Sequence, residues 1–122
     1  MYFPEDQVTE DPVRFIASEI IREKILLYME DEIPHGVAVE IEEFAEEDDL
    51  TRISACIYCE RKTHKGMIIG KGVRKLKGIG KSAREELEAL LGTRVFLQTW
   101  VKVKENWRDS DIALSNFGYK QQ

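Results

Sequence analysis

The sequence contains no apolar run that approaches the roughly 20 residues of a membrane-spanning helix, and its first twelve residues are acidic and unlike a signal peptide. Cysteine is scarce, because Cys56 and Cys59 are the only two, which is too few for a disulfide framework and typical of a reducing compartment. These absences predict a cytoplasmic protein whose 122 residues form one domain with a modest core, without help from disulfides or metals.

Acidic residues are missing from one long stretch. Between Arg61 and Arg84 there are nine Lys or Arg residues and no Asp or Glu. The net charge of -5 therefore hides a polarised chain, in which residues 1–50 sum to -13 and residues 51–122 sum to +8. This asymmetry predicts one cationic face that meets a negatively charged partner. Two solvated faces of opposite sign are the alternative.

Apolar periodicity divides the chain into helices and strands. A helix is expected to begin at Asp11-Pro12, an N-cap followed by proline in the first turn, and to end near Met29. Alternating apolar residues predict strands over 37–42, 51–60 and 93–104, and Phe96 and Trp100 share one face of the last strand. Further helices are expected over 70–77, 82–91 and from about 110. This order predicts an α+β fold with helices packed on one small sheet.

Two glycine motifs resemble nucleotide-binding loops but fail on their context. Gly80-Lys81-Ser82 ends like a P-loop, yet the motif needs glycine where this chain has Lys75, and no strand precedes it. Gly78-x-Gly80-x-x-Ala83 joins two expected helices rather than a strand and a helix, so it is not a dinucleotide fingerprint. We interpret 78–80 as a tight corner between two helices.

The Cys56-x-x-Cys59 pair, with His64 as a third ligand, would suggest a metal or redox site. On the expected strand, however, residues three apart point to opposite faces, so the two thiols cannot share an ion. The carboxylates between 40 and 49 lack the spacing of a calcium loop. Because no nucleophile, base or metal set converges, we expect no metal, no cofactor and no enzyme activity.

The run Ile68-Ile69-Gly70-Lys71-Gly72-Val73 before a helix resembles the I-G-x-x-G loop of the KH domain, which clamps a short single strand of RNA. In such a loop, Gly70 lets the backbone approach a phosphodiester, while Lys71 and Arg74 neutralise it. The resemblance implies an apolar shelf for bases at Ile68 and Ile69. The predicted RNA-binding residues are Ile69, Gly70, Lys71, Gly72, Val73, Arg74 and Lys77, with Lys65, Ile68, Lys75 and Lys81 at the margin of the site.

The similarity covers nearly the whole chain. Segments 2–9, 14–17, 19–25, 32–35, 64–72, 76–80 and 100–108 resemble the carboxy-terminal region of the Era family of bacterial GTPases. This resemblance implies a type II KH domain over 11–105, an α+β fold whose helices pack on one face of a three-stranded mixed sheet. It also implies a linker over 1–10 from a GTPase domain that this chain lacks, and a tail over 106–122 with a short helix. The implied partners are the 3′ end of 16S ribosomal RNA and the 30S ribosomal subunit, bound by a monomer that hydrolyses nothing.

One residue departs from the family pattern, because the second glycine of its loop is replaced by Val73. We expect the fold to tolerate valine, since a residue at the start of a helix can adopt a negative φ. The cost is expected at the ligand, where a β-branched side chain stands in the path of a phosphate. Two other roles stay open: protein docking through the acidic hairpin or through Phe96 and Trp100, and a peripheral contact of the cationic face with the inner membrane.

Overall fold

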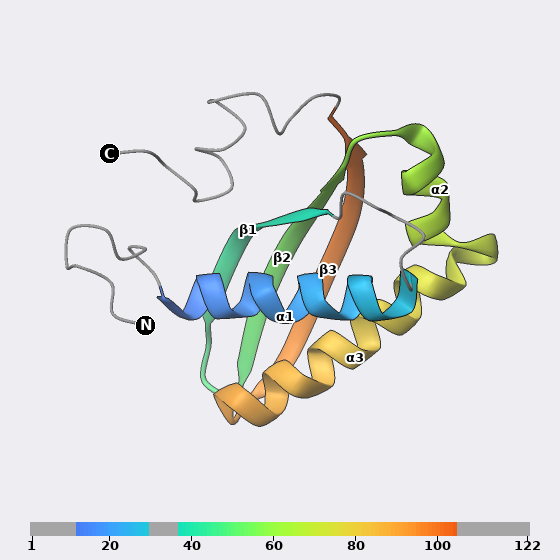
Figure 1. Ribbon diagram of the computed structural model, residues 1–122. Coiled ribbons are helices and arrows are strands. Elements are labelled where there is room, and N and C mark those ends of the chain that lie inside the picture. The colour runs from blue at the N-terminus through green and yellow to red at the C-terminus, as the bar shows by residue number, and fades with distance from the viewer. Residues whose placement is uncertain (1–11, 30–36, 105–122) are drawn as a thin grey trace, which may run out of the picture.

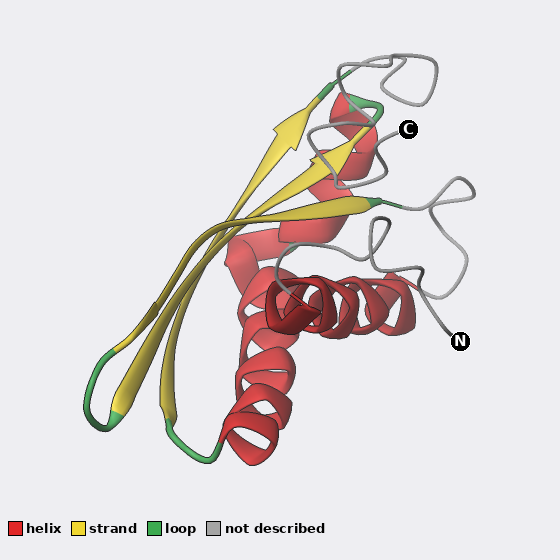
Figure 2. Cartoon of the chain, turned by 90° about the vertical axis from the view of Figure 1, so that its left-hand side faces the viewer, coloured by secondary structure: helices red, strands yellow, loops and turns green. Residues whose placement is uncertain are grey.

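The described helices all cover one face of a three-stranded sheet, and none of them lies on its other face, called here the open face (Figures 1 and 2). The computed structural model describes residues 12–29 and 37–104. The elements are α1 (Pro12–Met29), β1 (Ala38–Glu46), β2 (Leu50–Cys59), α2 (Lys62–Ile69), the short 3-10 turn η2 (Lys71–Val73), α3 (Arg74–Leu91) and β3 (Arg94–Val103). The predicted α+β class, with helices on one face of the sheet, is confirmed. The expected segments 1–10 and 106–122 lie outside the described residues.

The sheet is mixed, with strand order β1-β2-β3. β1 and β2 form an antiparallel hairpin whose register shifts between Ile41 and Glu43, and β3 lies parallel to β2. A parallel neighbour needs a crossover connection, which α2 and α3 provide. β1 continues to Glu46, beyond the predicted end near residue 42, so Glu42, Glu43 and Glu46 belong to the strand, and the acidic residues at 47–49 form the turn.

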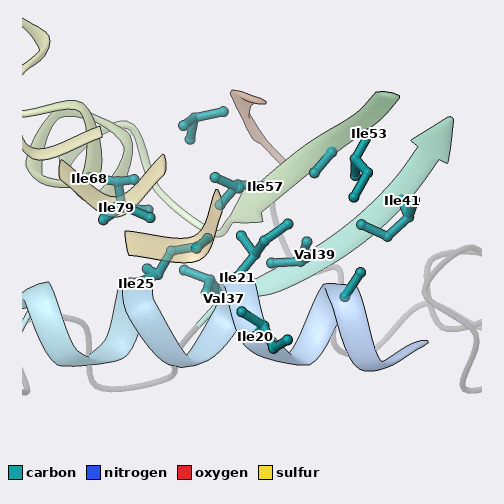
Figure 3. Packing of buried hydrophobic residues seen from close by; sticks show 14 of the residues in the cluster. Ile20, Ile21, Ile25, Val37, Val39, Ile41, Ile53, Ile57, Ile68 and Ile79 are labelled. Atoms are coloured by element: carbon teal, nitrogen blue, oxygen red, sulfur yellow. The ribbon is translucent and has the colours of Figure 1, made fainter. Parts of the chain in front are cut away.

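The core lies between the sheet and the helices (Figure 3). Ile21 and Ile25 of α1, Ile57 of β2, and Ile79 and Leu87 of α3 are fully buried there. The spacing of these residues follows the helical and strand periods read from the sequence. On β3 the predicted alternation is confirmed, since the side chains at Val95 and Val101 are buried and those of Phe96 and Trp100 are exposed. No helix of the described segments has the length and apolar content needed to cross a membrane.

Two helix predictions are wrong. α3 runs without a break through 78–80, where a corner was predicted, and the actual corner lies at 70–73. Gly78 lies where α1 crosses α3, and the crossing leaves little room for a side chain. A Cβ on Gly78 would lie 2.8 Å from Cε2 of Tyr28. The Tyr28 hydroxyl lies 3.2 Å from Oγ of Ser82 in the next turn of α3. α2 was missed entirely, because Gly66 interrupts its middle and its stability comes from burial of His64 and Ile68 rather than from local propensity.

The two cysteines lie on opposite sides of the sheet, as predicted. Cys59 belongs to the core cluster, whereas Cys56 is aligned with Trp100 on the outward face. Burial raises the pKa of both thiols. Among the residues that the structure describes, no three His, Cys, Asp or Glu side chains are grouped to hold a metal ion.

The contact at Gly78 gives a stability prediction. Gly78→Ala is expected to lower the free energy of unfolding by about 1 kcal/mol. Overpacking against Tyr28 destabilises the domain by about 1–3 kcal/mol, and the higher helix propensity of alanine offsets about 1 kcal/mol of this loss. Gly80→Ala is the matched control, since nothing lies within 4 Å of a Cβ at that position. It is expected to raise the same quantity by about 1 kcal/mol. Urea unfolding of both variants measures the difference, and equal stabilisation by both would contradict the tight helix crossing.

Candidate nucleic-acid interface

The corner between α2 and α3 is built from left-handed backbone conformations. Gly70 has φ 75° and ψ 170°, Gly72 has φ 64° and ψ 25°, and Val73 has φ 64° and ψ 18°. The Gly70 amide donates to the Gly66 carbonyl at 2.8 Å and closes α2, and the Val73 amide donates to the Gly70 carbonyl at 3.1 Å. These conformations turn the chain from one helix into the next within four residues and expose Lys71 and Gly72 at the tip.

Gly70 is required by both its conformation and its surroundings. A φ of 75° with ψ near 170° is a region that essentially only glycine occupies. A Cβ at this position would also lie 2.9 Å from Cβ and 3.0 Å from the backbone nitrogen of Lys75. By contrast, a Cβ on Gly72 would meet nothing within 4 Å, so only the positive φ favours glycine there.

The prediction of a negative φ for Val73 is wrong. It does not take a negative φ at the start of α3 but a left-handed conformation, and it is the only described residue other than glycine that does so. For an L-residue this conformation costs roughly 1–2 kcal/mol, and a β-branched side chain is especially disfavoured. The tertiary turn imposes it, because α3 begins directly afterwards and runs back across the sheet. Val73 therefore stores strain at the tip of the predicted site, and its side chain is exposed.

A groove opens beside this corner, between α3 and the edge strand β3. Its volume is about 330 Å³, and it is lined by Val73, Leu76, Lys77, Gly80, Lys81, Arg84, Leu97 and Thr99. On α3 the lining residues recur every three or four positions, so they share one face of the helix. Leucine side chains and Thr99 form one part of the surface, and three cationic side chains form the other. The groove therefore offers apolar contact and positive charge together in a narrow space.

The structure places most of the predicted residues around the corner and the groove. Val73, Lys77 and Lys81 line the groove, whereas Lys71, Gly72 and Arg74 are exposed at the corner itself. Lys65 lies on α2, and Lys75 lies in the first turn of α3 beneath Gly70. Neither lines the groove.

The predicted apolar shelf needs a correction. Ile68 is fully buried in the core, where it packs beneath the corner and has no surface for a ligand. Ile69 is partly buried against the same core. These residues support the corner from the inside, and the leucine side chains that line the groove are those of Leu76 and Leu97. Ile68 was expected to face the ligand, but on α2 its side chain points into the core.

Five groove residues were missed by the sequence analysis, namely Leu76, Gly80, Arg84, Leu97 and Thr99. The first three follow from the helical period once α3 is known to be continuous. Nη1 of Arg84 forms an ion pair with Oε1 of Glu88 at 3.2 Å. The other carboxylate oxygen of Glu88 accepts a hydrogen bond from the backbone amide of Val95 at 2.9 Å. This carboxylate links α3 to the start of β3 and helps to set the width of the groove. Leu97 and Thr99 carry no local signal, because only the parallel placement of β3 brings them to α3.

The chain is similar to known proteins along its whole described length. Residues 32–108 match the KH domain family. GTPase Era of Clostridioides difficile is 57% identical over 99% of this chain, and GTPase Era of Alkaliphilus oremlandii is 60% identical over 97% of it. This chain spans about 41% of the length of either relative.

Solved structures agree with these relatives. Aquifex aeolicus Era bound to GDP and aluminium fluoride has a TM-score of 0.84 and 42% identity, over 98% of this chain and 40% of that chain. A structure of Era in complex with MgGDPNP and nucleotides 1506–1542 of 16S ribosomal RNA has a TM-score of 0.85 and 41% identity, over 99% of this chain and 41% of that chain. The fold and the family relationship therefore point to the same domain.

Proposed function

The chain belongs to the KH-domain family, as the KH domain of an Era GTPase, and on this premise we propose that it binds single-stranded RNA at the 3′ end of 16S ribosomal RNA during biogenesis of the 30S subunit. The observation that carries this proposal is the corner at 70–73, which opens directly onto a groove with apolar and cationic walls. The related Era structure that contains 16S ribosomal RNA supports the choice of ligand.

The geometry suits a single strand rather than a duplex. Lys71 and Arg74 are exposed at the tip of the corner, where they neutralise phosphates, and the glycine backbone lets the phosphodiester come close. Bases then lie in the groove against Leu76 and Leu97. Because β3 is an edge strand of the described sheet, its backbone groups beside Thr99 are available to read base edges.

Within an intact protein this domain acts as the RNA-binding arm and carries out no hydrolysis itself. The GTPase portion of the relatives lies outside the aligned part, which is about 41% of their length. We assign 11–105 to the KH domain, 1–10 to a linker from the GTPase domain and 106–122 to a tail. An anionic membrane would interact with the corner through charge only. RNA fits better, because its phosphates pair with the cations and approach the glycine backbone, and its bases fit the adjacent groove.

Neutralising the corner is expected to weaken RNA binding about tenfold near physiological salt. Each lost phosphate contact to a single strand removes about 0.7 from the slope of log affinity against log salt, so the double variant Lys71→Gln with Arg74→Gln should lose about 1.4 of that slope. Titration with a strand copying the 3′ end of 16S ribosomal RNA at several salt concentrations measures both quantities. Lys62→Gln, at the other end of α2, is the control. An unchanged affinity and slope in the double variant would refute the corner as the site.

A further inference from the structure

The open face of the sheet carries two exposed aromatic side chains. All described helices lie on the other face (Figure 2), and the outward residues of β3 include Phe96, 45% exposed, and Trp100, 39% exposed. Isolated apolar side chains are common at surfaces. These two, however, lie on one face of one strand, four residues or about 13 Å apart, so their rings can contact separate groups of a single extended ligand.

Cationic side chains accompany these aromatic rings. The guanidinium of Arg52 lies 5.7 Å from the centre of the Phe96 ring, and Lys102 is exposed two residues beyond Trp100. We call Arg52, Phe96, Trp100 and Lys102 the β3 strip. Arg52 also pairs with Glu47 at 3.1 Å, but both side chains are about half exposed, so the pair is weak and a phosphate can compete for Arg52.

Within the strands, the acidic residues of the open face belong to its opposite edge, and Glu47, which pairs with Arg52, lies in the loop after β1. Glu40 and Glu43 lie on β1, where they accept hydrogen bonds from Tyr58 and Ser54 of the central strand, both at 3.2 Å. The outward residues of the strands are therefore divided, with carboxylates on β1, and with the aromatic rings and Lys102 on β3 next to Arg52 of β2. A polyanion is attracted to the β3 half and repelled from the β1 half, whereas an apolar protein surface would gain nothing from this division.

The β3 strip is continuous with the groove around the edge of the sheet. Leu97 and Thr99 line the groove from one face of β3, and Phe96 and Trp100 occupy the same stretch of its other face. No described strand lies beyond β3. A KH loop clamps about four nucleotides, so any longer RNA must continue past the groove, and the edge of β3 is the short path to the open face.

We propose that the β3 strip is a second RNA-contact surface, on which bases of the strand that leaves the groove stack against Phe96 and Trp100. This inference rests on the proposed function of the groove. Aromatic rings stack on any base, and Arg52 and Lys102 pair with the phosphates between them. The strip therefore adds affinity for long RNA without adding strong base preference.

The test compares a short and a long RNA, both beginning with the same groove sequence. The short strand has about four nucleotides, and the long strand carries an unstructured extension. Phe96→Ala and Trp100→Ala are each expected to weaken binding of the long strand about tenfold and to leave the short strand unchanged. Leu90→Ala is the matched control, since Leu90 is an exposed apolar residue on α3 outside the groove. An equal loss for both strands, or no loss for either, would overturn the proposal.

Fluorescence of Trp100 gives a second readout that leaves the strip intact. Trp100 and Trp107 are the two tryptophans, so Trp107→Phe isolates the signal. The long strand is expected to quench Trp100 and the short strand is not. Absence of quenching by the long strand, with groove binding intact, would overturn the proposal. Failure of the groove itself is recognised separately, because Lys71→Gln with Arg74→Gln would then leave short-strand binding unchanged.

Discussion

Gly70→Ala is expected to weaken RNA binding about 30-fold, the largest loss from any single substitution in the corner. Alanine at φ 75° and ψ 170° is strained by about 1–3 kcal/mol, and its Cβ would lie 2.9 Å from Cβ of Lys75. The free domain escapes this strain by rebuilding the corner, and binding must then restore the original conformation at a cost of about 2 kcal/mol. The measurement is the dissociation constant for a strand copying the 3′ end of 16S ribosomal RNA.

Gly66→Ala is the matched control for this prediction. Gly66 lies in α2, one turn before the corner, and a Cβ there meets nothing within 4 Å. We expect RNA affinity to stay unchanged and the free energy of unfolding to rise by about 1 kcal/mol. If Gly70→Ala bound RNA as tightly as the unmodified domain, the corner would not need its present conformation for binding.

Val73→Gly is expected to make the domain more stable and to tighten RNA binding. The left-handed conformation of Val73 costs roughly 1–2 kcal/mol, and glycine removes nearly all of this strain. The greater freedom of glycine in the unfolded chain destabilises the folded domain by about 0.5–1 kcal/mol, which offsets part of the gain. The net gain is about 1 kcal/mol in the free energy of unfolding, measured by urea denaturation. Removal of the exposed side chain also clears the approach of a phosphate, and we expect the dissociation constant to fall severalfold.

Val73→Ala separates strain from bulk. Alanine keeps most of the left-handed penalty but removes the β-branch, so RNA binding should tighten while stability stays nearly constant. A loss of stability in Val73→Gly would contradict the strain at this position. Equal or weaker RNA affinity in both variants would show that the ligand accommodates valine, or that the side chain forms part of the apolar wall of the groove.

The secondary structure was predictable where one residue pattern decided it. The strands follow from alternation, since each has one face on the core, and α1 follows from Pro12 in its first turn. The segment 70–73 was recognised as a candidate binding loop from its glycines and cations, but a helix was predicted there and the corner was placed at 78–80. Errors arose where local preference and packing disagree. Gly78 and Gly80 signal a break, yet α3 continues, because its buried face is stabilised by the sheet and Gly78 makes room for Tyr28.

The site was predictable only in part, for a similar reason. Lys71, Gly72 and Arg74 are adjacent in sequence and remain adjacent in space, so a linear motif identifies them. Leu97 and Thr99 reach the groove only because β3 lies parallel to β2 and beside α3. The parallel crossover brings together residues of α3 and β3 that are some twenty positions apart in the sequence. Helical and strand periodicity cannot predict such a contact, because each describes only the faces of a single element.

The sequence by itself determined the charge polarity, the α+β class and the glycine-rich cationic loop at 70–73, because these depend on composition and short-range pattern. The tertiary structure decided the helix α2, the continuity of α3, the left-handed conformation of Val73 and the pairing of α3 with β3 that forms the groove. Each of these depends on burial against partners far away in the chain, whose packing free energy exceeds the local preference for another conformation.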